Sequence, residues 1–154
     1  MSLERFHEAQ ASAWAGYDTA LAEIRAGGKR SHWIWYIFPQ IEGLGRSSTA
    51  RAYAIEDLAE ACAYLRDPIL RARYEEIVAA VSEQLVRGIK VEDLMGSQID
   101  ALKLVSSLTL FGAGRTARAR GSGLRLARGT FGSPARTNRR ARLCRLRFYT
   151  CPNR

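Results

Sequence analysis

The apolar side chains of residues 3–111 recur at helical spacing, and this pattern stops at Gly112. Apolar positions three, four and seven apart give each segment one apolar face, as helices that pack on a common core require. Residues 112–154 show neither this period nor the alternation of a strand. The pattern therefore predicts an all-α fold, with one compact domain of five or six helices over residues 1–111 and an irregular Arg/Gly-rich tail over residues 112–154.

The charge of the chain divides at the same glycine. The formal net charge is +9, but residues 1–111 hold 12 Lys+Arg and 15 Asp+Glu, whereas residues 112–154 hold 12 Arg and no acid. The body thus carries −3 and the tail +12, so the basicity of the whole chain says nothing about what the body binds. The tail is rich in residues that GC-rich codons encode. We hypothesise that it is poorly ordered and translated out of frame after a frameshift near Gly112; a genuine arginine-rich arm is the alternative, and the coding DNA distinguishes the two.

Several classes of protein are excluded by composition and pattern. The longest strongly apolar run, residues 33–38, is far shorter than the roughly 20 residues that span a bilayer, so no membrane partner is expected. Four acids and no apolar stretch stand in the first 25 residues, so no signal peptide is expected. Three irregularly spaced cysteines argue against a disulfide framework and fit the reducing cytoplasm, so a cytoplasmic protein is expected. With only two histidines in the chain, neither a metal site nor a cofactor is expected.

Start and stop signals divide the body into helices. Gly27-Gly28 ends a first helix, Asp67-Pro68 starts another, and Gly96-Ser97 precedes the last one. Residues 33–38 fit either a strand, which their aromatics favour, or a short buried helix that ends before Pro39. The predicted helices are residues 3–25, a segment from Ser47 or Ser48 through residue 55 that continues or restarts at residues 58–65, then residues 68–87, 91–95 and 97–110.

Several motifs of the body resemble a small, all-helical bacterial family of unknown function, whose members are often labelled calpastatin. The residues that carry the resemblance are Phe6, Ala9-Gln10, Ser31-His32-Trp33-Ile34-Trp35-Tyr36-Ile37-Phe38-Pro39-Gln40, Gly43-Leu44-Gly45, Ser47-Ser48, Tyr53-Ala54-Ile55, Ala63-Tyr64-Leu65, Pro68, Leu70, Asp100, Lys103-Leu104, Ser106-Ser107 and Thr109-Leu110-Phe111. The resemblance covers about residues 3–111 and implies a helical fold but no reaction. The family's usual last segment, an amphipathic stretch with acidic residues, is replaced here by the tail.

A glycine loop at residues 43–48 is the first candidate site. Backbone N–H groups at Gly43 and Gly45, followed by Ser47 or Ser48 at a helix start, form the kind of concavity that binds phosphate. The alternative is a turn with ordinary helix capping, because Gly-x-Gly alone is a weak signal.

An aromatic block supplies the second candidate. Trp33 and Trp35 have faces on which bases stack, and Gln40 has an amide that reads a base edge. His32 carries an imidazole, the side chain that most often serves in proton transfer. The alternative is that the aromatics form the core.

The third candidate lies in the last predicted helix. Asp100 and Lys103 are one turn apart and suit an ion pair or an anion site, while Lys103 and Ser107 suit a base and a nucleophile or ligand-binding group. The alternative is an inert surface ion pair beside hydrogen-bonded serines.

Three classes of function follow. In the first, the protein binds a phosphorylated or nucleotide-like small molecule, and His32, Asp100 and Lys103 would be the catalytic residues if it hydrolyses that ligand. This class requires His32, the 43–48 loop and Lys103 to converge. In the second, the protein is a non-enzymatic, inhibitor-like interaction protein with an exposed apolar patch. In the third, the tail binds nucleic acid without specificity. The pattern predicts no oligomeric state.

Overall fold

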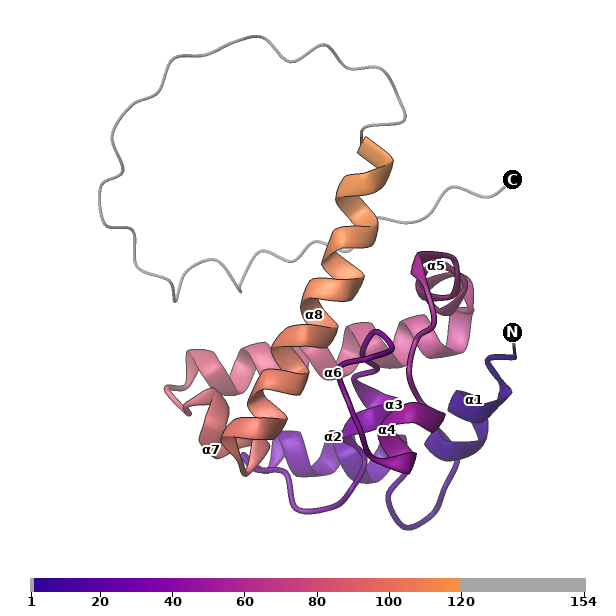
Figure 1. Cartoon of the computed structure of the whole chain (residues 1–154). Coiled ribbons are helices and arrows are strands. Elements are labelled where there is room, and N and C mark those ends of the chain that lie inside the picture. The colour runs from indigo at the N-terminus through magenta and orange to yellow at the C-terminus, as the bar shows by residue number, and fades with distance from the viewer. Residues whose placement is uncertain (1, 120–154) are drawn as a thin grey trace, which may run out of the picture.

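The structure is a computed structural model that describes residues 2–119, with side chains to residue 112. Within these residues it contains eight helices and no strand, apart from an isolated parallel bridge between Ile41 and Ile55, and the all-α prediction is confirmed (Figure 1). No helix in the described part of the chain is long and apolar enough to cross a membrane. The helices are α1 (Glu4–Gln10), α2 (Tyr17–Arg25), α3 (Ile34–Ile37), α4 (Ser48–Ala52), α5 (Leu58–Arg66), α6 (Pro68–Val86), α7 (Val91–Met95) and α8 (Gln98–Ala119).

The helix count exceeds the predicted five or six, because residues 3–25 form two helices and the aromatic block adds the short helix α3. Residues 3–25 form α1 and α2, and the chain turns between them at Gly16, where a Cβ would lie 2.1 Å from the Ser12 carbonyl oxygen. The close approach of these two backbone groups is incompatible with one continuous helix. The segment from Ser48 restarts as α5, because the Asp57 carboxylate accepts a hydrogen bond from the Glu60 N–H and caps a new helix.

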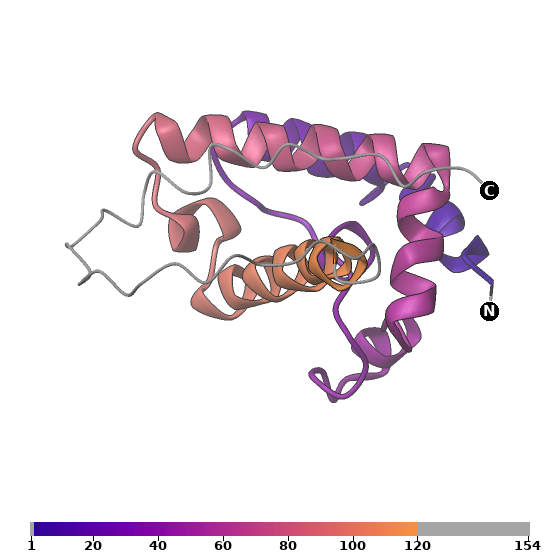
Figure 2. The ribbon, with the colours of Figure 1, turned by 90° about the horizontal axis from the view of Figure 1, so that it is seen from above.

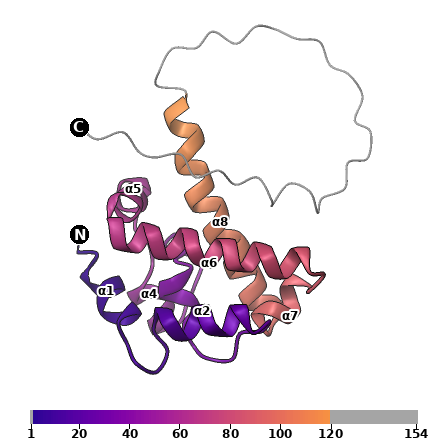
Figure 3. The ribbon, with the colours of Figure 1, turned by 180° about the vertical axis from the view of Figure 1, so that it is seen from behind.

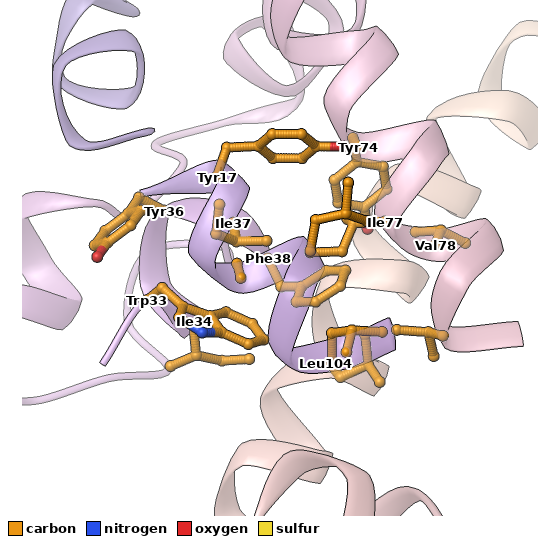
Figure 4. Close-up of a cluster of buried hydrophobic side chains, with 14 of the residues drawn as sticks. Tyr17, Trp33, Ile34, Tyr36, Ile37, Phe38, Tyr74, Ile77, Val78 and Leu104 are labelled. Atoms are coloured by element: carbon orange, nitrogen blue, oxygen red, sulfur yellow. The ribbon is translucent and has the colours of Figure 1, made fainter. Parts of the chain in front are cut away.

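The aromatic block forms the short helix α3 rather than a strand. Trp33, Ile34 and Phe38 are 0% exposed and Ile37 is 2% exposed, so the segment lies inside the protein with apolar side chains on all sides. Figure 4 shows Trp33, Phe38 and Leu104 of α8 in one apolar cluster. Because apolar side chains stand at every position of the segment, periodicity alone cannot distinguish a strand from a helix.

The longest fully described helix, α6, packs along α2 and forms one wall of the core (Figure 3). It begins where the sequence predicts, because Asp67 accepts hydrogen bonds from the N–H groups of Ile69 and Leu70 and Pro68 occupies the first turn. Seen from above, α6 and α8 lie on opposite sides of the body, with α7 between them at one end and α5 at the other (Figure 2).

The last helix runs beyond its predicted end at Leu110. α8 continues through Gly112 to Ala119, and its C-terminal half leaves the body in Figures 1 and 3. Once a helix is nucleated, each added residue costs little, and the alanines and arginines after Gly112 have high helix propensity. The remainder of the predicted tail, residues 120–154, lies outside the described residues.

Candidate functional site

Two lysines and two tryptophans gather around Asp100. The Oδ2 atom of Asp100 lies 2.8 Å from the Lys29 Nζ, and its Oδ1 atom lies 2.8 Å from the Lys103 Nζ. The Lys29 ammonium lies 5.5 Å from the ring centroid of Trp33, and the Lys103 ammonium lies 4.6 Å from that of Trp35. Both distances are in the range of cation–π contacts. We call these five residues the lysine–tryptophan cluster.

The charged groups of the cluster are largely shielded from water. The side chains of Lys29, Asp100 and Lys103 are 9%, 15% and 22% exposed. Burial raises the pKa of Asp100, but the hydrogen bonds and charges of the two lysines outweigh it, and the pKa stays below its usual value. Asp100 is therefore ionised at neutral pH, and the three groups together carry a net charge of +1.

The fold fixes Lys29 through its backbone. α2 ends at a left-handed Gly27, with φ of +90°, and the chain then turns so that the Lys29 N–H donates to the Leu94 carbonyl oxygen at 2.8 Å. Gly96, with φ of +73°, closes α7 against the same segment, and a Cβ there would lie 3.2 Å from the Lys29 carbonyl oxygen. Lys29 is thus held between the end of α2 and the end of α7, beside the start of α8.

The other two charged groups come from the first turns of α8. Ser97 accepts a hydrogen bond from the Asp100 N–H at 3.1 Å, and the i, i+3 spacing of Asp100 and Lys103 brings their side chains together. The ion pair that the sequence predicts between them is confirmed.

Glu23 fastens the segment between Lys29 and the aromatic block. Its carboxylate accepts hydrogen bonds from the N–H groups of Arg30 and Ser31, at 2.7 and 3.0 Å, from the Ser31 hydroxyl, and from the Trp33 Nε1–H at 2.8 Å. Burial raises the pKa of Glu23, but these donors outweigh it and lower the pKa to about 2. Because all four donors are neutral, Glu23 is held in place without an ion pair to either lysine of the cluster.

The aromatic candidates are divided between core and site. Trp33 is fully buried, as the core alternative predicts, whereas Trp35 is half-buried and borders the cluster. The His32 side chain is exposed, and its carbonyl oxygen accepts a hydrogen bond from the Tyr36 hydroxyl at 3.2 Å. The backbone carbonyl oxygen of Gln40 accepts a hydrogen bond from the Ile55 N–H, while the buried side-chain Nε2 of Gln40 has no hydrogen-bond partner among the described residues.

The 43–48 loop has the local structure of an ordinary helix start. Ser47 caps α4, because its hydroxyl accepts a hydrogen bond from the Ala50 N–H at 3.1 Å, and Ser48 is the exposed first residue of the helix. Gly43 is exposed with φ of +90°, and a Cβ on Gly45 would lie 2.3 Å from the Ala50 Cβ. Within the described part of the chain, no hydrogen bond or ion pair joins this loop to His32, Asp100 or Lys103. Of the three groups whose convergence the first functional class requires, only Lys103 belongs to the lysine–tryptophan cluster, and no contact in the described residues brings His32 or the loop to it.

Ser107 belongs to the core and not to the cluster, in contrast to its predicted place beside Lys103. It is 0% exposed, and its hydroxyl lies 3.1 Å from the Tyr74 hydroxyl of α6. The short serine side chain meets α6, whereas the longer side chain of Lys103 reaches Asp100 and Trp35. A ligand from solvent cannot reach Ser107 without opening the core.

Lys29 and Glu23 were not among the candidates from the sequence. Lys29 and Asp100 are far apart in the sequence although their side chains are in contact, and no local spacing predicts such a pair. Glu23 lies on a predicted helix as an ordinary acidic residue, and its donors follow the turn at Gly27. Only the tertiary fold brings these groups together.

An apolar groove lies between α6 and α8. Its volume is about 90 Å³, and its lining is Val78, Val81, Ser82, Leu85, Val91, Leu104, Val105 and Leu108. The apolar surface extends past Val105 along the outer face of α8, where Leu102 and Ile99 are 65% and 67% exposed. An exposed apolar patch is what the second functional class predicts. In the described residues, no group of three His, Cys, Asp or Glu side chains is placed to hold a metal ion.

Comparison with known proteins places this fold in a family. A family model described as "Protein of unknown function (DUF1810)" matches residues 1–124, and so extends past the predicted end of the resemblance. No protein of curated function matches the chain. The crystal structure of the conserved hypothetical protein Rv1873 from Mycobacterium tuberculosis is similar, with 43% sequence identity, a TM-score of 0.67, and a match that covers 76% of this chain and 79% of that chain. The chain therefore belongs to the DUF1810 family of proteins of unknown function.

Proposed function

We propose that the protein binds a small anionic ligand at the lysine–tryptophan cluster. The observation that carries the proposal is that two shielded ammonium groups share one carboxylate, which leaves one positive charge without a partner in the cluster. An ammonium group has three N–H donors, so each lysine retains donors that Asp100 does not use. An anion at these donors would neutralise a charge that water reaches only in part.

The expected affinity is that of a compact ionic contact. A hydrogen bond to a charged group contributes about 1.5–3 kcal/mol, so two such bonds give about 4 kcal/mol and a Kd of about 1 mM for an isolated anionic group. Phosphorylated and nucleotide-like molecules remain within the ligand class, because their phosphate groups present paired anionic oxygens to the lysines.

Binding has more support than hydrolysis. Asp100 is ionised and bonded to two ammonium groups, which suits it to orient the lysines but not to donate a proton. The exposed His32 remains the candidate for proton transfer, and its replacement by Gln tests this role in an assay for hydrolysis of a bound ligand.

The first test is a thermal-shift screen of the full chain against inorganic phosphate, nucleotides, ADP-ribose derivatives and small carboxylates at matched ionic strength. A ligand at 100 times its Kd should add about 2.7 kcal/mol to the free energy of unfolding. Lys29→Gln and Lys103→Gln should each remove the effect, and Lys90→Gln, which replaces an exposed lysine outside the cluster, should retain it. A stabilisation that survives both cluster substitutions would refute the proposal.

A second candidate function is interaction with a protein, in keeping with the calpastatin-like label. The apolar groove and the exposed Leu102 and Ile99 favour it. We propose a second copy of this chain as the first partner to test. Light scattering across a hundredfold range of concentration should then detect a dimer that Val105→Asp weakens.

The third candidate, nucleic-acid binding by the arginine-rich tail, rests on residues outside those described. If the tail binds phosphate backbones, log K should fall with log salt concentration by about 0.9 for each phosphate neutralised. A flat salt response would exclude this function.

A further inference from the structure

We infer that the ligand of the lysine–tryptophan cluster is a small carboxylate, bound as a monoanion that bridges the Lys29 and Lys103 ammonium groups opposite Asp100. This inference rests on the proposed function and narrows its ligand class. Three features of the cluster support it: the spacing of the two lysines, the local charge, and the position of the Lys103 ammonium over the Trp35 ring.

The two ammonium groups are already spaced for a carboxylate. Asp100 places one oxygen 2.8 Å from each of them, so their separation matches the two oxygens of a single carboxylate group. The inferred ligand carboxylate would bridge the same pair through N–H donors that Asp100 does not use. The cluster would then hold two positive and two negative charges in alternation.

The local charge favours a single negative charge on the ligand. With Asp100 ionised, a monoanion brings the cluster to neutrality, whereas a dianion leaves an uncompensated negative charge in a shielded site. The neighbouring Glu23 adds to this preference, because it is ionised and its partners are all neutral donors.

The occupied face of Trp35 favours a compact ligand over one with a planar base. The Lys103 ammonium lies over the ring, 4.6 Å from its centroid, so a planar base that stacked on this face would have to displace it. Displacement would also break the ion pair of Lys103 with Asp100. Trp35 thus stabilises the Lys103 ammonium, and this face of its ring is not free for the base stacking that the sequence predicts.

The inference is tested by titrating the full chain with propionate, methyl phosphate and AMP at pH 8, where the phosphate groups are dianions because their second pKa is about 6. The readout is the three tryptophan indole N–H signals in the NMR spectrum, since Trp33 and Trp35 belong to the cluster and the exposed Trp14 does not. Propionate is expected to shift the two cluster signals and to bind about tenfold more tightly than either phosphate, which corresponds to about 1.4 kcal/mol.

Variants separate the possible failures. Lys103→Gln should weaken propionate binding at least tenfold, Lys103→Arg should retain most of it, and Lys90→Gln should leave it unchanged. Asp100→Asn, which raises the cluster charge to +2, should abolish the preference for propionate over methyl phosphate. If methyl phosphate or AMP binds as tightly as propionate to the unmodified protein, the inference fails and the proposed function stands. If no anion shifts the signals of Trp33 and Trp35, or if propionate binds Lys29→Gln and Lys103→Gln as it binds the unmodified protein, both fail.

Discussion

Replacing Asp100 by Asn should lower the free energy of unfolding of the body by more than the loss of an exposed ion pair would. Asparagine has nearly the same size and keeps one carbonyl oxygen, so packing is preserved, while both lysines lose their anionic partner. The three charged side chains are all less than a quarter exposed. Removing one partner of a fully buried pair costs about 3–5 kcal/mol, and removing an exposed partner costs at most about 1 kcal/mol. For this partly shielded triad we expect a loss of about 3 kcal/mol.

The loss is measured by urea unfolding of the full chain at pH 7, with Asp93→Asn as the matched control. Asp93 is an exposed acid on α7, outside the ion pairs of the described residues, and its replacement should change stability by no more than about 0.5 kcal/mol. A loss of about 3 kcal/mol corresponds to a fall in Tm of about 10 °C for a domain of this size.

The pH dependence supplies a second readout of the same group. Because the folded-state pKa of Asp100 lies below its unfolded value of 3.8, its contribution is present above that value and is lost as the pH falls through the folded pKa. Asp100→Asn should therefore lose stability at pH 7 and show a smaller loss on acidification than the unmodified protein. Equal stability of Asp100→Asn and Asp93→Asn at pH 7 would refute the view that the cluster is a coupled, shielded unit.

Three further outcomes are expected. Glu23→Gln should lower the free energy of unfolding by about 1–2 kcal/mol at pH 7, because the amide cannot accept all four hydrogen bonds. In the unmodified protein the stabilisation by Glu23 is present above pH 4.5 and is lost as the pH falls toward 2, so urea unfolding at pH 7 and pH 3 checks both expectations. Ser107→Ala should lower the free energy of unfolding by about 1–2 kcal/mol, because the Tyr74 hydroxyl loses its hydrogen-bond partner. Propionate binding should stay unchanged, and a change in the Kd for propionate would place Ser107 in the site. Val105→Asp should lower any self-association seen by light scattering without lowering propionate affinity, and undiminished self-association would exclude the apolar groove as the contact surface.

Local sequence signals predicted much of the fold. The start of α6 at Asp67-Pro68 and the end of α2 before Gly27 were found because capping and left-handed turns depend on a few adjacent residues. The break between α1 and α2 was missed, because the periodic apolar residues continue through it and the tight backbone turn at Gly16 leaves no mark on that period. The end of α8 was missed because the apolar pattern stops at Gly112, whereas residues of high helix propensity continue beyond it.

The candidate site was predicted only as far as its members are neighbours in the chain. Asp100 and Lys103 are one helical turn apart, so their pairing follows from spacing. The pairing of Lys29 with Asp100 depends on how α2, α7 and α8 meet, which no local pattern encodes. The core position of Ser107 likewise depends on which face of α8 meets Tyr74 of α6.

The central claim, that the lysine–tryptophan cluster is an anion-binding site, is tested most directly by the propionate titration followed through the tryptophan indole signals. The claim predicts saturable shifts of Trp33 and Trp35, with a Kd of about 1 mM, no shift of Trp14, and loss of the response in Lys29→Gln and Lys103→Gln but not in Lys90→Gln. It is contradicted if all three indole signals stay in place up to 100 mM propionate, or if the shifts persist in both cluster variants.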